Sequence, residues 1–215
     1  MIVSRRILKI LIRALKIGFF GEKQTPSVPL GREHMQNCEL LLNRSEMLSK
    51  LKKGGKIAEI GVAQGDFSEQ ILKITEPDSL HLIDIWNSRT YGTSLFKEVT
   101  ARFKGEIHEG RVRIHRKIST DAAGDFEDDY FDWIYIDTTH LYDMTREELV
   151  KYASKVKRDG IIAGHDYTMG NWDSLNRYGV IEAVHEFCVK YGWELVYLTL
   201  ESAENQSFAI KRIQK

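Results

Sequence analysis

Acidic and imidazole side chains follow two apolar runs in the second half of the chain. Asp137 comes at the end of one run, and His140 follows it three residues later. His165 and Asp166 come directly after a later apolar run. Carboxylate oxygens are ligands for hard divalent cations such as Mg²⁺, whereas histidine suits manganese, iron or zinc better. An imidazole with a pKa near about 6.5 can also accept a proton at neutral pH.

These four side chains therefore predict a reaction centre with two parts. We expect Asp137, His165 and Asp166 to form a site for a divalent cation, and His140 to act as a general base. Each residue also has a plainer interpretation. Asp166 can cap a helix or form a turn, and His140 can be an ordinary surface or core histidine, as most single histidines are. The chemical interpretation requires the two apolar runs to be neighbouring parallel strands, whose carboxyl ends meet at one edge of a sheet.

An earlier segment with two glycines has the spacing of a nucleotide-binding loop. Gly61 and Gly65 follow the apolar run that starts at Lys56, and glycine allows close backbone approach to a ligand and tight turns. Asp84 ends the next apolar run, where a carboxylate can accept hydrogen bonds from both ribose hydroxyls. Trp86, two residues further on, is predicted to cover an adenine face. The plainer alternative is a simple turn and an acid that caps a helix.

Two classes of cofactor fit this arrangement. Dinucleotides such as NAD bind in the same place, but their pyrophosphate needs the loop Gly-x-Gly-x-x-Gly, which this chain lacks. Asp66 would also place a negative charge at the start of the helix, where the pyrophosphate lies. A sulfonium nucleoside carries no phosphate and is not repelled. We therefore expect S-adenosylmethionine, with an NAD-dependent oxidoreductase as the alternative.

The elements that must position these residues alternate between strand and helix patterns from about residue 33. Strand patterns cover 56–62, 80–84, 111–116, 131–137 and 160–164, and helical patterns cover 36–52, 66–74, 95–104, 143–157 and 180–191. This alternation predicts an α/β fold with a mostly parallel, doubly wound sheet. The last two strand patterns, Trp193–Leu200 and Ser207–Ile213, are too close in sequence for a helical crossover and predict an antiparallel C-terminal hairpin.

Four segments together resemble the class I S-adenosylmethionine-dependent methyltransferases, most closely the small-molecule branch known as methyltransferase domain 24. These segments are Glu59–Ser68, Leu82–Trp86, Phe131–His140 and Gly160–Tyr167. The resemblance covers about residues 35–213 and implies a Rossmann-like, seven-stranded sheet whose last strand is antiparallel. It implies that Glu59 and Gly61 lie near the methionine part of the cofactor, Asp84 on the ribose, and Ile118-Ser119 beside the adenine. The cofactor-binding set expected on these grounds is Glu59, Gly61, Gly65, Phe67, Ser68, Asp84, Ile85, Trp86, Ser119 and Asp137.

The resemblance also bears on the reaction. Metal-dependent O-methyltransferases, including the catechol type, carry Asp-x-x-Lys where this chain has Asp137-Thr-Thr-His140. Related sugar O-methyltransferases carry Asp-Asp-Tyr where this chain has His165-Asp166-Tyr167. The resemblance therefore implies O-methylation of a sugar, a secondary metabolite or another small molecule. Mg²⁺ or another divalent cation is the expected additional cofactor.

The overall composition excludes a general attraction for nucleic acid. The chain has 215 residues, 42% of them hydrophobic, and its 31 basic residues equal its 31 acidic ones. Its two cysteines, Cys38 and Cys188, are far apart in sequence, which is typical of a reduced, cytoplasmic protein.

The first 23 residues differ in charge from the rest of the chain. They hold one acid, Glu22, and six basic residues: Arg5, Arg6, Lys9, Arg13, Lys16 and Lys23. We expect residues 1–32 to form a basic amphipathic helix and a linker, and residues 33–215 to form the catalytic domain. Residues 1–20 are expected to pack on another copy or cover the substrate, in preference to peripheral contact with the inner face of a membrane. A non-catalytic nucleotide-binding protein that docks on a membrane or partner through this leader is a further alternative.

Overall fold

The structure is a computed structural model that describes residues 25–88, 91–171, 176–202 and 204–214. The amphipathic helix expected within residues 1–20 lies outside these ranges, and its contacts stay a prediction. Residues 25–31, the end of the expected linker, contain no helix or strand. Among the described residues, no helix is both long enough and apolar enough to cross a lipid bilayer.

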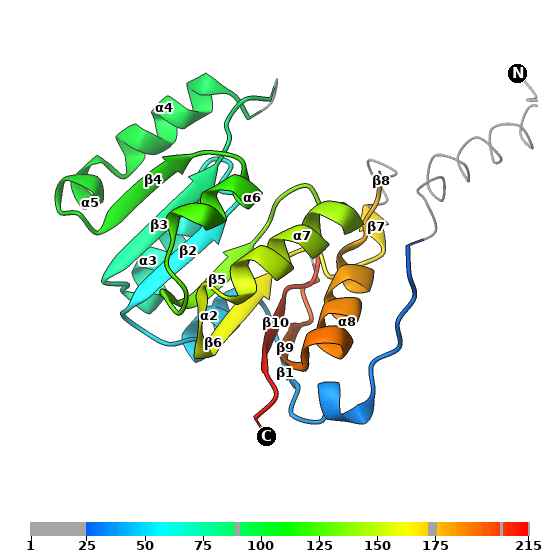
Figure 1. The fold of residues 1–215 in the computed structure, drawn as a ribbon. Coiled ribbons are helices and arrows are strands. Elements are labelled where there is room, and N and C mark those ends of the chain that lie inside the picture. The colour runs from blue at the N-terminus through cyan, green and yellow to red at the C-terminus, as the bar shows by residue number, and fades with distance from the viewer. Residues whose placement is uncertain (1–24, 89–90, 172–175, 203, 215) are drawn as a thin grey trace, which may run out of the picture.

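A sheet of eight strands forms the centre of the described part of the chain, in the order β1-β9-β10-β6-β5-β2-β3-β4 (Figure 1). The strands are β1 Glu39–Leu41, β2 Lys56–Ile60, β3 Ser79–Asp84, β4 Val112–Arg116, β5 Phe131–Ile136, β6 Val156–Gly164, β9 Trp193–Thr199 and β10 Phe208–Arg212. The five strands from β6 to β4 are mutually parallel, and β10 is antiparallel to β6 and β9. This topology confirms the predicted doubly wound sheet and its antiparallel hairpin.

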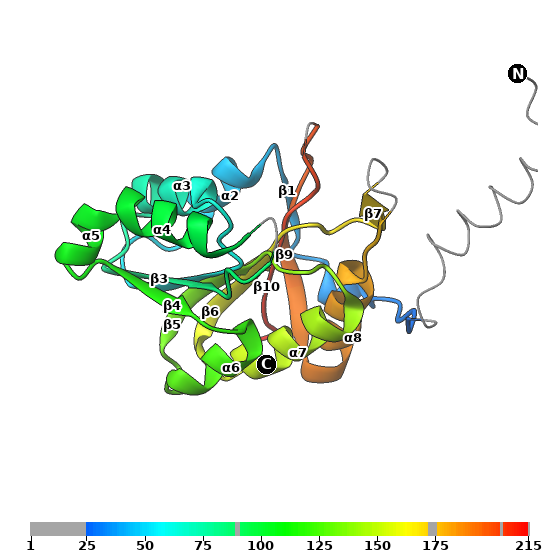
Figure 2. The same cartoon turned by 90° about the horizontal axis from the view of Figure 1, so that it is seen from above.

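Helices cover both faces of the sheet (Figure 2). One face carries α2 Arg44–Lys50, α3 Asp66–Thr75, α4 Thr93–Arg102 and α5 Lys104–His108. The other carries α6 Ser119–Ala122, α7 Tyr142–Ala153 and α8 Val180–Tyr191. Short 3₁₀ helices occur at η1 Arg32–His34 and η2 Ala123–Asp125, and a separate small hairpin pairs β7 Gly170–Asn171 with β8 Asn176–Arg177. Each face has its own apolar core, so the site must lie at an edge of the sheet.

One predicted helix is wrong in its first part. Residues 36–52 were expected to form one helix, but the segment contains the strand β1, which pairs parallel to β9, and the shorter helix α2. Asn43 separates the two, because its side chain caps the helix by accepting a hydrogen bond from the Glu46 N–H at 2.9 Å. The short apolar run at residues 40–42 fits either a helix or a strand, and only the pairing with β9 decides it. This strand is the eighth of the sheet, beyond the seven that were expected.

A second difference lies between α7 and β6. The helix was expected to continue to residue 157, but it ends at Ala153, and Val156 begins β6 opposite Phe131. Val156 is fully buried in the strand, and an apolar residue fits the buried face of a helix equally well, so its apolar character does not distinguish the two. The strand ends near residue 164 as predicted.

The exits of β2 and β5 touch at Gly61. This glycine has φ +89°, and a Cβ there would lie 1.8 Å from the carbonyl oxygen of Asp137. The backbone hydrogen bonds of the sheet continue on both sides of this point. Gly61 N–H donates to Ile83 O of β3 at 2.8 Å, and Asp137 N–H donates to Ile60 O of β2 at 2.8 Å. Glycine is therefore required for steric reasons. The contact brings the glycine loop and the first acid of the predicted reaction centre to the same point of the sheet edge.

Candidate functional site

Asp84, at the end of β3, organises the glycine loop. Its Oδ2 accepts hydrogen bonds from the N–H groups of Val62 at 2.9 Å and Ala63 at 3.1 Å, and its Oδ1 accepts one from Trp86 N–H at 2.9 Å. A carboxylate has about four lone-pair positions, so some capacity is left for a ligand. The structure thus brings Asp84 and the Gly61–Gly65 loop together, as the sequence predicts. The ribose contact itself stays a prediction.

The predicted role of Trp86 needs correction. Its indole has no exposed surface, and its Nε1 donates to the Ala63 carbonyl at 3.0 Å beneath the loop. The ring packs against Phe96 with centroids 5.3 Å apart. A side chain buried in this way supports the loop and does not present a face to an adenine. Ile85 is half-buried at the same strand end and Ile118 is 43% exposed, so these two residues are better placed to line the adenine side.

Glu59 and Ser68 form a buried pair beneath the loop. The Ser68 hydroxyl donates to a Glu59 carboxylate oxygen, and both side chains are almost completely buried. Burial raises the pKa of Glu59 to about 8, although the bond from Ser68 opposes that shift. The carboxyl group therefore largely keeps its proton at neutral pH. Phe67 is also buried, with its ring 4.3 Å from that of Tyr135, so Phe67 and Ser68 can meet a ligand mainly through their backbone.

An ion pair occupies the start of α3. Gly65 turns into this helix with φ +83°, and Asp66, the first helical residue, pairs with Arg102 at 2.6 Å. Arg102 also donates to the Gln64 carbonyl at 3.0 Å. In dinucleotide-binding folds a pyrophosphate lies at this helix start. The negative charge of Asp66 favours a cofactor without phosphate, which agrees with the interpretation of the sequence.

Glu148 on α7 joins the predicted adenine segment to the reaction centre. Ser119 Oγ donates to Glu148 Oε1 at 2.5 Å, and Thr138 Oγ1 donates to Glu148 Oε2 at 2.9 Å. Glu148 has no exposed surface, and burial raises its pKa to about 7. Sequence reasoning missed this residue. The available indication was its position four residues before Tyr152, which places both on the buried face of the helix.

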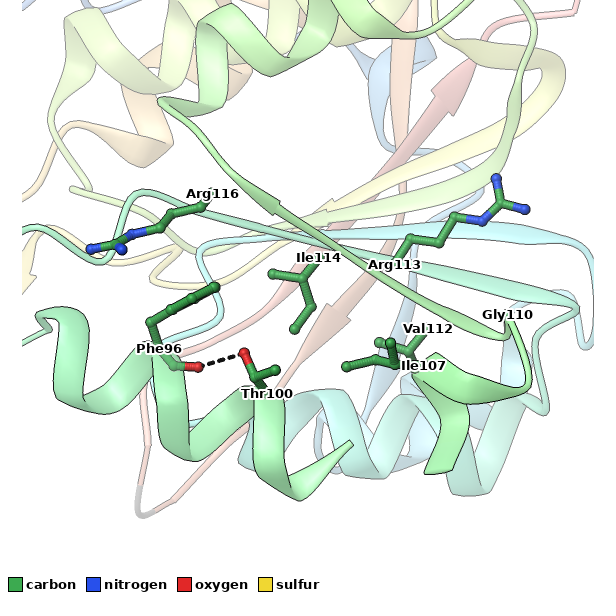
Figure 3. A pocket seen from close by; sticks show the side chains of 8 residues that line it. All are labelled: Phe96, Thr100, Ile107, Gly110, Val112, Arg113, Ile114 and Arg116. Carbon is green, nitrogen blue, oxygen red and sulfur yellow. Dashed lines mark hydrogen bonds between the residues drawn. The ribbon is translucent and has the colours of Figure 1, made fainter. Parts of the chain in front are cut away.

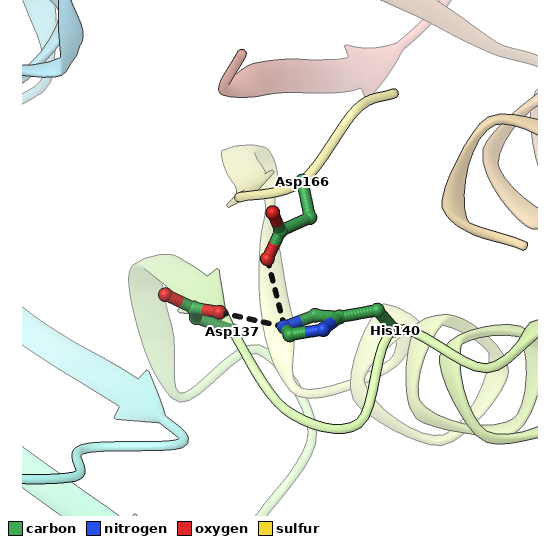
Figure 4. A group of neighbouring side chains, drawn as sticks. All are labelled: Asp137, His140 and Asp166. Atoms are coloured by element: carbon green, nitrogen blue, oxygen red, sulfur yellow. Dashed lines mark hydrogen bonds and ion pairs between the residues drawn. The ribbon is translucent and has the colours of Figure 1, made fainter. Parts of the chain in front are cut away.

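The four predicted reaction-centre residues meet at the ends of β5 and β6, where Asp137, His140 and Asp166 face one another (Figure 4). His140 Nε2 lies 2.8 Å from Asp166 Oδ2 and 3.1 Å from Asp137 Oδ1. His165 Nδ1 lies 3.3 Å from Asp166 Oδ2 and 3.8 Å from Asp137 Oδ2. Two strands and their following turns therefore supply one compact cluster of two carboxylates and two imidazoles.

The charges of this cluster are strongly coupled. Burial alone would lower the pKa of His140, but the bonds to Asp137 and Asp166 outweigh it and raise that pKa to about 9. Burial opposes ionisation of Asp166, yet His140 and His165 hold its pKa well below the usual range. Burial would lower the pKa of His165, but the bond to Asp166 together with the charges of Asp137 and Asp166 outweighs it and raises that pKa. At neutral pH an imidazolium thus lies between two carboxylates.

The backbone at this cluster is strained. His140 has φ +60° and Asp166 has φ +57°, which costs a non-glycine residue about 1–3 kcal/mol. Gly179 N–H donates to the His140 carbonyl at 2.8 Å, and the Tyr178 ring lies 4.6 Å from the imidazole. Asn205, from the loop between β9 and β10, donates to Asp166 Oδ1 at 2.5 Å. These contacts hold the two strained residues in place, and no pattern in the sequence indicates the contact of Asn205.

A divalent cation fits the donor set. Ligand atoms of Asp137, His140 and Asp166 lie within 4.8 Å of one another, and no other such group of three occurs in the described ranges. The sequence interpretation named His165 as the imidazole ligand, whereas the structure places His140 closer to both carboxylates. His165 Nε2 is buried without a hydrogen-bond partner. Two carboxylates with an imidazole suit manganese, iron or zinc better than magnesium.

A separate cavity lies away from this cluster. It has a volume of about 400 Å³ and opens between β4 and the helices α4 and α5 (Figure 3). Its lining residues are Phe96, Thr100, Ile107, Gly110, Val112, Arg113, Ile114 and Arg116. None of them belongs to the predicted cofactor or metal set, so this cavity does not mark the cluster at β5 and β6.

A protein-family model described as a methyltransferase domain matches residues 58–167. The chain belongs to this family. The matched range starts in β2 and ends one residue after Asp166, so it contains Asp84 and the whole cluster around His140. The protein is thus a class I, S-adenosylmethionine-dependent methyltransferase. No curated protein matches the chain.

Solved structures of low sequence identity share the fold of this methyltransferase. A putative rRNA-methylase from Clostridium thermocellum has a TM-score of 0.60 and 12% identity over 80% of this chain and 94% of its own. A putative type 11 methyltransferase from Sulfolobus solfataricus has a TM-score of 0.56 and 16% identity over 79% and 89%. SMU.1697c, a putative methyltransferase from Streptococcus mutans in complex with SAH, has a TM-score of 0.56 and 10% identity over 78% and 94%. At these identities the likeness shows the fold.

Proposed function

We propose that this methyltransferase moves the methyl group of S-adenosylmethionine onto a hydroxyl oxygen of a small molecule, such as a sugar or another metabolite. The observation that carries the proposal is the cluster of Asp137, His140 and Asp166 beside the glycine loop. Methyl transfer from a sulfonium is an in-line displacement, and a neutral hydroxyl is a weak nucleophile. It therefore needs a group that takes its proton or a cation that favours its ionisation. A neutral amine has its own lone pair and would need no such cluster.

The order of the strands supports a pose for the cofactor. Ser119 follows β4, Asp84 ends β3, Gly61 follows β2 and Asp137 follows β5. Neighbouring strands are about 4.8 Å apart, so adenine, ribose and sulfonium can lie over successive strand ends. The methyl group would then face the acceptor over β5 and β6. The same pose gives Ser119 and Asp84 their predicted contacts with adenine and ribose.

His140 is the proposed base. Asp137 and Asp166 orient its imidazole, and they also keep it protonated until the pH approaches about 9. A hydroxyl acceptor that enters the cluster would meet His140 once this proton has left. A divalent cation held by Asp137, Asp166 and His165 would leave His140 free as the base, and it would supply Lewis acidity that lowers the pKa of the acceptor hydroxyl.

The alternatives predict other ligands. An NAD-dependent oxidoreductase would be stabilised by NAD, whereas the proposed enzyme is stabilised by S-adenosylhomocysteine, so a thermal-shift comparison separates the two. A non-catalytic protein would bind the nucleoside without turnover and would use residues 1–23 for docking. Liposome binding and oligomeric state, measured with and without these residues, test that role and the proposed contacts of the leader.

The decisive experiment is turnover with methyl-labelled S-adenosylmethionine. We expect label to move onto sugar or phenolic hydroxyls and not onto matched amines in which nitrogen replaces the acceptor oxygen. Chelation should reduce turnover at least tenfold, and added Mn²⁺ should restore it. Transfer to nitrogen alone would contradict the proposed acceptor class. Full activity after chelation would remove the cation from the proposal and leave His140 as the only activating group.

A further inference from the structure

Arg44, the first residue of α2, brings a positive charge to the cofactor side of the sheet. Its side chain is 20% exposed, and its guanidinium lies over the Phe67 ring, 4.8 Å from the centroid. The guanidinium is within hydrogen-bonding reach of the Tyr135 hydroxyl and acts electrostatically on Glu59 and His165. Arg44 therefore lies between the start of α3 and the reaction centre.

The protein supplies only an exposed partner for this charge. Within the described residues, the single carboxylate paired with the guanidinium is that of Glu204, at 2.8 Å. Glu204 is half exposed and belongs to the loop between β9 and β10. The nearby acid Glu59 is buried and largely protonated at neutral pH, so it compensates little of the charge. A mostly buried guanidinium with one replaceable partner is suited to an anionic ligand.

A cavity of about 310 Å³ opens at this point. Its lining residues are Leu42, Asn43, Arg44, Ser45, Gln70, Glu201, Ser202 and Glu204. Glu201 accepts the backbone N–H of Arg44 at 2.6 Å, which fixes the start of α2 at the cavity wall. The cavity thus provides room beside the guanidinium for a small group.

The pose of the cofactor determines which group arrives there. With adenine at Ser119 and ribose at Asp84, the 5′ end of the nucleoside lies over the end of β2. One sulfonium substituent, the methyl group, must face the cluster around His140. The remaining substituent is the amino-acid chain, and it leaves over the start of α3, where Phe67 and Arg44 lie. Its terminal carboxylate can take the place of Glu204 beside the guanidinium, while Glu201 stays bound to the Arg44 backbone N–H.

We propose that Arg44 binds the α-carboxylate of the amino-acid part of S-adenosylmethionine. The ligand carboxylate replaces Glu204 as the partner of the guanidinium, and Glu204 occupies the place of that carboxylate in the free protein. An arginine can hold a carboxylate through two parallel hydrogen bonds, which fixes the orientation of the amino-acid chain and hence of the sulfonium. This inference rests on the proposed cofactor and pose.

The test compares two ligands that differ in this one part. S-adenosylhomocysteine contains the amino-acid chain, and 5′-methylthioadenosine is the same thionucleoside without it. We expect Arg44→Ala to weaken S-adenosylhomocysteine about 10- to 100-fold in calorimetric titrations and to leave 5′-methylthioadenosine within about twofold. Arg44→Lys should recover part of the loss. Lys50→Ala is the matched control, because Lys50 is a cation of the same helix and pairs with the exposed Glu39 at 2.8 Å.

A second variant tests the exchange of partners without touching the buried side chain. Glu204→Gln removes an exposed competitor, so we expect S-adenosylhomocysteine to bind about two- to fivefold more tightly, with no change for 5′-methylthioadenosine. Equal losses for both ligands in Arg44→Ala would overturn the proposal, because Arg44 would then only support the fold. Unchanged S-adenosylhomocysteine affinity in Arg44→Ala, or in Glu204→Gln, would also contradict it. If the unmodified protein binds neither ligand, the cofactor assignment itself fails together with the inference.

Discussion

The two halves of the proposed crevice are built by different means. At the ends of β2 and β3, the carboxylate of Asp84 is satisfied by three backbone N–H groups from its own strand end and the adjacent loop. At the ends of β5 and β6, the carboxylates of Asp137 and Asp166 are satisfied by side chains, among them His140 and Asn205. Backbone donors stay in place whatever side chains the loop carries. The cofactor half is therefore constrained by geometry, whereas the reaction half depends on the identity of a few side chains.

Removing His140 should have the largest effect on catalysis. We expect His140→Ala to lower kcat about 10²- to 10⁴-fold, because a positioned base contributes on this scale. Affinity for S-adenosylhomocysteine should be unchanged, since the cofactor half does not use this side chain. Steady-state kinetics on a hydroxyl acceptor and calorimetric titration measure the two quantities. Full turnover in this variant would show that another group takes the proton.

Substitution of Asp84 should have the opposite effect, a loss of cofactor affinity instead of a loss of kcat. Asp84→Ala removes a charged acceptor from the ribose and leaves the N–H groups of Val62 and Ala63 without their partner. We expect affinity for S-adenosylhomocysteine to fall about 100-fold, since hydrogen bonds to charged groups are worth about 1.5–3 kcal/mol. Asp84→Asn keeps one acceptor oxygen and should lose less. Unchanged affinity in Asp84→Ala would remove the ribose contact from the model of binding.

The pH profile gives a sharper view of the reaction half. His140 must be neutral to act as a base, and its pKa of about 9 means that kcat without added metal rises with pH up to that value. Asp166→Asn removes one of the two charges that hold the proton, so the rising limb should move at least about one unit to lower pH. A limb that does not move would show that another group controls the profile.

The same pKa shifts set the pH range of stability. His140 is stabilised in its charged form, so its contribution to folding is fully present below about pH 6.5 and is lost as the pH rises through about 9. Asp166 has a lowered pKa, so its contribution is present above about pH 4 and is lost as the pH falls further. Thermal unfolding between pH 3 and 10 should reveal both limits, and His140→Ala should remove the alkaline one.

Glu148 contacts both halves of the crevice, so one substitution can show whether cofactor affinity and kcat depend on the same side chain. Glu148→Leu removes both acceptors from Ser119 and Thr138, and we expect both cofactor affinity and kcat to fall, each about tenfold. Glu148→Gln keeps the shape, and a hydroxyl can accept from the amide, so most of the loss should be recovered. A loss of stability alone, with cofactor affinity and kcat intact, would show that this residue only supports the fold.

Arg102 should have the smallest effect. Its ion pairs with Asp66 and Glu69 are largely exposed, and exposed pairs contribute about 0–1 kcal/mol. We expect Arg102→Ala to change cofactor affinity less than about threefold and unfolding free energy by less than about 1 kcal/mol. Calorimetric titration and denaturant unfolding measure these values. A large loss of affinity would mean that the cofactor half relies on this side chain after all.

The same contrast explains what the sequence could predict. Gly61, Gly65 and Asp84 follow from local patterns, because each stands at the end of a strand whose apolar run is visible in the sequence. The cluster of Asp137, His140, His165 and Asp166 also follows, since parallel neighbouring strands bring their ends together. In both cases the place of a residue at the end of a single strand was enough to predict its position in the site.

The features that were missed or wrongly predicted depend on distant partners. Glu148 meets Ser119 across 29 residues, and Asn205 meets Asp166 across 39. Trp86 was expected at a ligand face, but it has φ +41° and its indole is fully buried, and a single residue of this conformation leaves no pattern in the sequence. The strand β1 became a strand only because β9 lies beside it. Tertiary contacts decide such cases.

The contact between Gly61 and the Asp137 carbonyl has an evolutionary consequence. Because the ends of β2 and β5 lie directly against each other, the spacing between the glycine loop and Asp137 is set by atomic radii within the sheet. The loops that would choose an acceptor take no part in that spacing. Such loops can lengthen, shorten or exchange their side chains while Gly61 and Asp137 stay in contact, so a change of loop need not disturb this part of the sheet edge.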